Sequence, residues 1–163
     1  MEIPGIILIV SIIIALLVFM YTSAYNKLLR NKNHANTTWL SIVKEVNIRF
    51  NLYTQFSQAI ASNIDANTLA QFNQSIANYT NKVAITDIID SYYATDQICK
   101  AILGVISTPE WMQAFNDSFN RIETLRKDYN DTILKINNLV KMFPTSLVAK
   151  MCGFEAWPFF RGI

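Results

Sequence analysis

The sequence is poor in the residues that most often carry out chemistry. Its 163 residues include four glycines, two cysteines and one histidine, and 16% of them are charged. Four scattered glycines cannot assemble a Walker loop or a dinucleotide fingerprint. His34 stands alone, without the Glu-x-x-His or His-Glu-x-x-His spacing of a metal site. Phosphoryl transfer, redox chemistry and metal catalysis are therefore disfavoured, and we expect no cofactor.

Thiol catalysis, paired-acid catalysis and nucleic-acid binding are disfavoured as well. Cys99 and Cys152 form no Cys-x-x-Cys pair and have no second histidine to activate them, so we expect two free thiols in a reducing compartment. The 12 carboxylates are scattered among basic neighbours. A net charge of +2 without a basic stripe predicts no nucleic-acid partner. We expect a protein that is not an enzyme.

Apolar residues are abundant, and they are concentrated at the start of the chain. From Ile3 to Asn26 there is no Asp, Glu, Lys or Arg. As a helix these residues would extend about 36 Å, enough to cross a hydrocarbon core of roughly 30 Å. We predict a transmembrane anchor in residues 1–26 and a helical body in residues 27–163. The alternatives are a signal peptide cut near Thr22-Ser23-Ala24, although Glu2 replaces the usual basic start, and a buried helix of a soluble protein.

The charges that flank this run predict its orientation. Lys27, Arg30 and Lys32 follow it, with no acidic residue before Glu45, whereas only Glu2 and the amino terminus precede it. Basic residues stay on the cytoplasmic side of a membrane. We therefore expect a single-pass protein of the cell membrane with its N-terminus outside and its body in the cytoplasm.

Beyond the anchor, apolar residues recur at helical spacing, and no strand pattern persists. One stripe continues from the anchor to Ile60, and a turn-prone segment of residues 62–67 interrupts it. A second runs from Leu69 to Ile106, with a change of phase at Val83–Thr86 that indicates a local kink or a change of packing partner. We predict an all-α fold, in which the transmembrane helix continues into an antiparallel bundle of three long helices plus a short C-terminal helix.

Proline and hydroxyl residues predict where the last two helices begin and end. The third helix begins at Pro109, with Ser107 or Thr108 as its cap, and closes at Phe143 before Pro144. The short fourth helix is capped by Thr145 or Ser146 and ends at Gly153. On the third helix, the exposed pairs expected at i,i+4 spacing are Glu123 with Lys127 and Asp131 with Lys135.

Helix lengths predict how the chain returns. Residues 25–63 and 66–107 would form helices of about 58 Å and 63 Å. The second helix could then run back to the membrane, which would place Trp111 near the headgroups and Pro144 at the distal end. We expect the aromatic tail "FEAWPFF" to dock on that distal end of the bundle.

Two blocks of the chain resemble the LemA family of membrane-anchored helical proteins. They are "YNKLLRNKNHANTTWLSIVKEVNIRFNL" after the anchor and "NRIETLRKDYNDTILKINNLVKMFPTSLVAKMCGFEAWPFF" near the end. The matching residues are Tyr25, Asn26, Trp39, Ile42, Arg49 and Leu52 in the first block, and Ile122, Arg126, Tyr129, Asn130, Asp131, Asn137, Phe143, Pro144, Ala149, Gly153, Phe154 and Phe160 in the second. The chain departs from the family pattern at Thr54 and Phe119, and residues 60–117 match poorly.

The resemblance implies a membrane-anchored helical bundle of no established enzymatic activity, in which the matching residues are structural or serve docking. For Tyr129 and Asn130 we expect a role in fixing helix register, with Arg49 and Arg126 as possible partners; a polar docking spot is the alternative. We expect residues 126–128 on a solvated face. The function we expect is a scaffold for unknown protein partners, or for copies of itself. Alternatives are an accessory subunit of an envelope protease, secretion or transport complex, and an enzyme with an unrecognised site.

Overall fold

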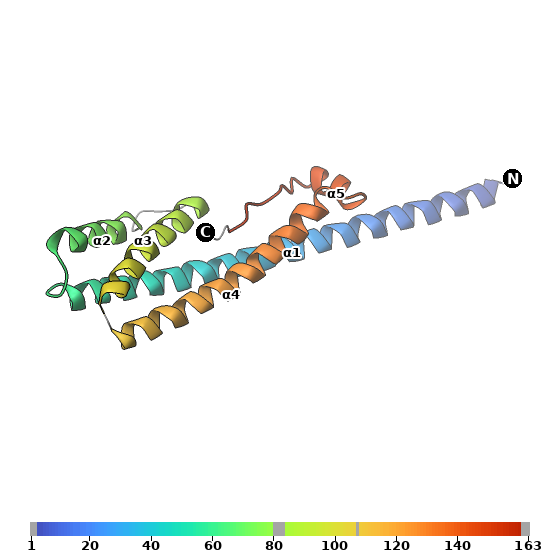
Figure 1. Cartoon of the computed structure of the whole chain (residues 1–163). Coiled ribbons are helices and arrows are strands. Elements are labelled where there is room, and N and C mark those ends of the chain that lie inside the picture. Colours follow the sequence, from blue (N-terminus) through green and yellow to red (C-terminus); the bar gives the residue numbers. More distant parts are fainter. Residues whose placement is uncertain (1–2, 80–83, 107, 161–163) are drawn as a thin grey trace. The chain divides into compact units, whose positions relative to one another are not determined.

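The computed structural model describes residues 3–79, 84–106 and 108–160. Over these residues the chain forms helices and no strands, so the prediction of an all-α fold is confirmed. The helices are α1 (Ile3–Ile60), α2 (Ala66–Tyr79), α3 (Ile85–Val105), α4 (Pro109–Leu139) and α5 (Thr145–Met151) (Figure 1). They belong to two compact units. We call Met1–Thr38 with Asp128–Phe159 the anchor unit, and Trp39–Lys127 with Phe160–Ile163 the hairpin unit.

Helix α1 is continuous from the apolar run to Ile60, as predicted. Its first part is long and apolar enough to cross a membrane, and the most apolar stretch of 18 residues has no buried residue within the structure. The interpretation as a buried helix of a soluble core is therefore wrong, because such a helix would be covered by the rest of the chain. The exposed apolar run is compatible with a single-pass membrane protein.

The predicted turn after α1 is confirmed, and a carboxylate stabilises the start of the next helix. The backbone N–H of Thr68 donates to Oδ1 of Asp65, 2.9 Å away. This is the geometry of an N-terminal cap. The hydrogen bonds from Thr68 lower the pKa of Asp65 below its usual value.

The second helix was predicted as one kinked element, but the structure has two. Helix α2 ends at Tyr79, and Ala84 has an extended backbone, with φ −71° and ψ 141°, just before α3 begins. Because an extended residue interrupts the i→i+4 ladder, the change of phase marks a break. Val83, where that change was predicted to begin, lies outside the described residues. Helices α2 and α3 then pack against each other as a hairpin (Figure 1), with the Thr95 hydroxyl donating to the Ser75 carbonyl at 3.3 Å.

This hairpin corrects the predicted path of the chain. The second segment folds back on itself, so Trp111 does not return to the anchor. Instead its ring centroid lies 5.4 Å from that of Phe56, near the C-terminal end of α1. At the other end of α1, within the anchor unit, the ring of Phe154 lies 6.1 Å from that of Tyr25. The aromatic tail therefore docks beside the anchor, and the expected positions of Trp111 and Pro144 are wrong.

Helix α4 begins at Pro109 as predicted, but ends four residues before Phe143. The Thr145 hydroxyl, expected to cap α5, instead donates to the carbonyls of Leu139 and Met142 at 2.7 Å and 2.8 Å, and so satisfies the end of α4. The Thr108 side chain makes no hydrogen bond to any described residue, and Ser107 is not among those residues. Helix α5 is followed by Gly153 with a φ of 68°, which suits the predicted glycine stop.

Candidate functional site

The strongest concentration of polar chemistry in the hairpin unit surrounds Arg49. This residue lies between Val46 and Tyr53 on the inward stripe of α1, where helical spacing directs all three toward the same side. Its side chain is only 3% exposed. A guanidinium this deep needs partners for its N–H groups, because burying an unpaired charge is costly.

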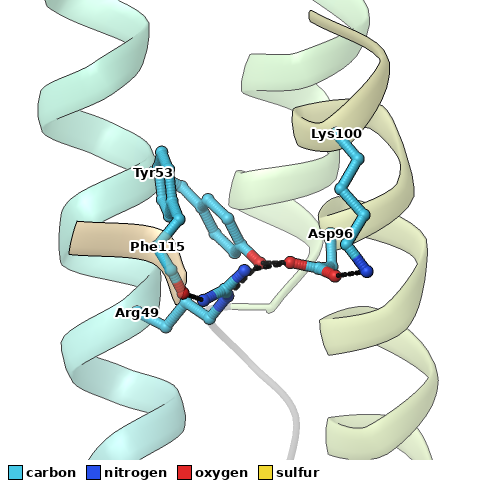
Figure 2. Close-up of polar contacts among 5 residues, drawn as sticks. All are labelled: Arg49, Tyr53, Asp96, Lys100 and Phe115. Atoms are coloured by element: carbon cyan, nitrogen blue, oxygen red, sulfur yellow. Dashed lines mark hydrogen bonds and ion pairs between the residues drawn. The ribbon is translucent and has the colours of Figure 1, made fainter. Parts of the chain in front are cut away.

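Three groups accept hydrogen bonds from Arg49 (Figure 2). Nε donates to the Tyr53 hydroxyl at 2.7 Å, Nη1 donates to the Phe115 carbonyl at 2.6 Å, and Nη2 pairs with Oδ1 of Asp96. The acceptors come from α1, α4 and α3, respectively. One side chain thereby joins three helices.

Asp96 is the second centre of the cluster. The Tyr53 hydroxyl donates to its Oδ1 at 2.9 Å, and Nζ of Lys100, one turn later on α3, lies 2.9 Å from its Oδ2 (Figure 2). The Asp96 side chain is 2% exposed, whereas that of Lys100 is 63% exposed. Lys100 therefore connects a buried carboxylate to the surface.

Aromatic rings surround the guanidinium. Its central carbon lies 5.3 Å, 5.8 Å and 5.2 Å from the ring centroids of Tyr53, Tyr92 and Phe115. The negative face of an aromatic ring attracts a cation, and more strongly where water is excluded. These rings replace part of the hydration that Arg49 loses on burial.

The cluster remains charged despite its burial. Burial opposes the charge of Arg49, but Tyr53 and Asp96 outweigh it, and the pKa of the guanidinium lies above its usual value. Burial likewise opposes the charge of Asp96, but Arg49 and the hydrogen bond from Lys100 outweigh it, and the pKa of the carboxyl lies below its usual value. The neighbouring thiol behaves differently, since burial raises the pKa of Cys99 to about 12. Cys99 is thus a neutral, inert thiol at neutral pH.

Two open pockets border the cluster. One of about 340 Å³ is lined by Arg49, Cys99, Lys100 and Phe119 among others, and another of about 310 Å³ is lined by Asp96, Lys100, Phe119 and Arg126 among others. Within residues 3–79, 84–106 and 108–160, no group of three or more His, Cys, Asp or Glu side chains could hold a metal. The hydrogen bonds and the ion pair of Arg49 join α1, α3 and α4, so the cluster connects these three helices internally.

A second polar arrangement lies in the anchor unit, where α4 holds the C-terminal tail. The side-chain amide of Asn137 donates to the Trp157 carbonyl at 3.0 Å and accepts from the Trp157 N–H at 2.8 Å. The Tyr129 hydroxyl donates to the Pro158 carbonyl at 3.3 Å. Arg49 was a predicted partner of Tyr129. Its hydrogen-bond acceptors are instead Tyr53, Phe115 and Asp96, which lie in the hairpin unit.

The other predicted residues are divided between the two units and form no single site. In the anchor unit are Tyr25, Asn26, Tyr129, Asn130, Asp131, Phe143, Pro144, Gly153 and Phe154; in the hairpin unit are Trp39, Ile42, Arg49, Leu52, Ile122 and Arg126. Ile42, Arg49, Ile122 and Tyr129 are buried, whereas Asn26, Asp131, Phe143 and Gly153 are exposed. Arg126 binds Glu123 at 2.6 Å, so the pair predicted between Glu123 and Lys127 is replaced by one at i,i+3 spacing. The side chain of His34, the single histidine, is 52% exposed.

Sequence reasoning missed Asp96, although a signal for it was present. The stripe of the second segment contains Tyr92 and Cys99, and the helical position between them is occupied by Thr95 and Asp96. An acid at an inward position, in a chain with an arginine at another, is the pattern of a buried ion pair. Tyr53 and Tyr92 were recognised only as apolar members of their stripes, whereas both contact the charge.

One comparison with known proteins gives a match. The family model of the LemA family matches residues 108–162, which cover α4, α5 and the aromatic tail. This C-terminal segment is similar to the LemA family, and the resemblance inferred from its sequence is confirmed over these residues. No curated protein and no solved structure matches the chain.

Several motif residues of the matched segment make structural contacts. Tyr129 and Asn137 hold the tail, and Phe154 packs on Tyr25 of the first block. The two quoted blocks thus meet within the anchor unit. Arg49 has acceptors in both regions: its ion-pair partner Asp96 comes from α3, outside the matched segment, whereas the Phe115 carbonyl lies within it.

Proposed function

We propose that the chain is a single-pass, membrane-anchored helical scaffold without catalytic activity. One observation carries the proposal: a single unbroken helix, α1, begins as an exposed apolar run and ends among the buried aromatic side chains of the hairpin unit. A helix with both parts attaches a folded interaction module to a membrane without a flexible linker. The Arg49–Asp96 cluster ties the helices of that module together.

The anchor is retained in this proposal. A signal-peptide cut after Thr22-Ser23-Ala24 would remove both Tyr21 and Ala24 from the mature chain. Yet Ala24 is buried in the same cluster as Leu28, Val148 and Ala149, and the Tyr21 hydroxyl lies 3.4 Å from the Cys152 thiol. These contacts support an anchor that belongs to the mature fold. Lys27, Arg30 and Lys32 support a cytoplasmic body.

Exposed apolar groups on the hairpin unit support protein partners. Val105 at the end of α3 is 85% exposed, and it borders an open groove of about 490 Å³ that Ile64, Ile98 and Ile102 also line. Apolar side chains around a groove are typical of docking surfaces. The same groove favours the alternative function, an accessory subunit of an envelope protease, secretion or transport complex. The two differ in whether one foreign partner is bound at fixed stoichiometry.

The test is photo-crosslinking in living cells. A photoreactive amino acid replaces Val105 in the full-length chain, and Lys44, an exposed polar position of the same unit, serves as the matched control. Crosslinked material is purified in detergent and identified by mass spectrometry. We expect products from position 105 that position 44 does not give. A single stoichiometric foreign partner would favour the accessory subunit, and self-crosslinks alone would indicate a homo-oligomeric scaffold. Equal or absent products at both positions would contradict docking at this groove.

Attachment is tested separately. The intact mass of the purified protein reports whether residues 1–24 are present, and extraction of membranes with alkaline carbonate reports whether the chain is integral. We expect an uncut chain in the membrane pellet. A chain beginning after Ala24 in the soluble fraction would overturn the anchor.

A further inference from the structure

The turn between α4 and α5, together with one side of α5, exposes large apolar side chains. The exposed fractions are 62% for Met142, 75% for Phe143, 55% for Leu147 and 75% for Met151. Leu147 and Met151 are four residues apart and therefore share a face of α5. We call these four residues the α5 patch. Several large apolar residues exposed together mark an interaction surface more often than single ones do.

The opposite side of α5 is attached to α1 immediately after the apolar run. Val148 and Ala149 are buried against Ala24 and Leu28, and Cys152 packs against the same cluster. The Tyr21 hydroxyl and the Cys152 thiol lie 3.4 Å apart. The position of α5 along α1 is thus determined by contacts to residues 21–28.

That position coincides with the edge of the predicted span. A helix rises 1.5 Å per residue, so a hydrocarbon core of about 30 Å takes about 20 residues and, counted from Ile3, ends near Thr22. Tyr21 and Tyr25, whose rings stack at 6.3 Å, lie where tyrosine is enriched in membrane proteins, at the boundary between acyl chains and headgroups. Helix α5 packs against this same stretch and therefore lies at the same depth.

The charges near the patch match a lipid surface. Residues 132–163 contain Lys135, Lys141, Lys150 and Arg161 but only one acidic residue, Glu155. Lys141 directly precedes the patch in the sequence, Lys150 lies between Leu147 and Met151, and both lysines are exposed. Exposed lysines around an apolar patch are typical of segments that lie in the interface of anionic membranes.

We infer that the α5 patch lies in the headgroup region of the membrane that α1 crosses, so that Phe143, Leu147 and Met151 insert at the acyl boundary while Lys141 and Lys150 face anionic headgroups. The inference rests on the proposed membrane anchor. The chain thereby contacts the bilayer twice, through the span and through α5. Two contacts restrict the tilt and rotation of α1, which a single span leaves free.

Spin-label depth measurements test the inference in the full-length chain. The protein is reconstituted in vesicles of phosphatidylethanolamine and phosphatidylglycerol, in a Cys152→Ser background that keeps a hydroxyl near Tyr21. Cys99 is left in place, because it is buried and its pKa is raised to about 12. Single labels are placed at Leu147→Cys and Met151→Cys, with Lys135→Cys, an exposed position on α4 in the same unit, as the matched control.

We expect labels at 147 and 151 to collide more with oxygen, which concentrates in lipid, and less with a water-soluble nickel chelate than the label at 135. Equal accessibility at all three positions would overturn the inference. Spin–spin broadening at 151 that disappears on dilution with unlabelled chains would also overturn it, because the patch would then bind a second copy.

A fourth label separates this inference from the proposal on which it rests. Leu8→Cys lies inside the predicted span, where Leu8 is 63% exposed within the structure. If position 8 reports lipid while 147 and 151 report water, the anchor stands and the α5 contact is wrong. If position 8 itself reports water, the anchor is wrong, and the inference fails with it.

Discussion

The two units of this chain are stabilised in different ways. In the hairpin unit the buried side chains include seven aromatic rings, and Phe50 stacks on Tyr79 with centroids 3.8 Å apart. Among the described residues of the anchor unit, Tyr129 is the only buried aromatic one, and the cluster around α5 consists largely of small aliphatic groups. The buried aromatic residues of the hairpin unit are Phe50, Tyr53, Phe56, Phe72, Tyr92, Phe115 and Phe160.

The contrast extends to the polar contacts. The hairpin unit has a buried ion pair among its rings, whereas the anchor unit relies on hydrogen bonds between α4 and the backbone of the tail. Burial of aromatic surface is the larger stabilising contribution, since each such side chain buries about 150–250 Å². The hairpin unit therefore buries more aromatic surface in its core. The anchor unit depends more on the packing of α5 and on hydrogen bonds to the tail. Each prediction below perturbs a contact in one of the two units.

The largest effect is expected from Asp96→Ala. This change leaves Arg49 charged and buried without its anionic partner, which typically destabilises a protein by about 3–5 kcal/mol. Hydrogen exchange measured by mass spectrometry should show lost protection in α2 and α3 and little change in α5. The control is the double variant Arg49→Met/Asp96→Leu, which removes both charges and should recover most of the protection. If the double variant is as unstable as Asp96→Ala, the loss is one of packing and not of charge.

The same ion pair predicts an acid-sensitive hairpin unit. The pKa of Asp96 is lowered on folding, so its contribution is complete above the unfolded carboxyl value of about 3.9 and is lost as the pH falls through the lower folded value. Urea unfolding should show a smaller free energy below about pH 4 than at neutral pH. The decrease should be weaker in Asp96→Asn. Because the pKa of Asp65 is also lowered, the difference between wild type and variant is the relevant quantity. Identical acid profiles would contradict an ionised Asp96.

Much of this contrast could be foreseen from the sequence, but not all of it. Pro109, Gly153 and the polar turn after Ile60 mark helix boundaries through local backbone chemistry, and the structure agrees with them. Arg49 was recognisable as a polar residue on an apolar stripe. Its partner could not be recognised, because the sequence contains 12 carboxylates. Only the packing of α3 on α1 determines that Asp96 is the one that pairs with Arg49.

The path of the chain was harder to foresee for a related reason. A change of phase at residues 83–86 fits either a kink in one helix or a break between two. Local sequence does not decide between them, since the difference depends on burial across the α2–α3 contact. The wrong prediction of one helix led to a wrong position for Trp111. A single helix of full length would have placed Trp111 near the membrane, whereas in the hairpin it lies beside Phe56.

A smaller effect, confined to the anchor unit, is expected from Asn137→Ala. The change leaves the N–H and carbonyl of Trp157 without their side-chain partner; these groups are only partly buried, so the cost should lie at or below the about 1–3 kcal/mol of a fully buried unsatisfied group. Protection should fall in residues 154–160 and remain unchanged in α2 and α3. Asn138→Ala is the matched control, because Asn138 is the exposed neighbour on the same helix. Equal loss in both variants would mean that the tail is not held by Asn137.

The smallest effect is expected from His34→Ala, which removes an exposed contact in the anchor unit that is an ion pair only when the imidazole is protonated. Nε2 of His34 lies 3.1 Å from Oδ1 of Asp128, with side chains 52% and 49% exposed. Exposed pairs contribute about 0–1 kcal/mol, because water and salt screen the attraction. Asp128 also keeps a hydrogen bond from the buried Thr38 hydroxyl at 3.0 Å, so the carboxylate is not left without a partner. The variant should unfold within about 1 kcal/mol of wild type, and the difference should shrink further in high salt. A loss of stability comparable to that of Asp96→Ala would show that the exposed pair contributes as much as the buried one. The contrast between the charged groups of the two units would then be wrong.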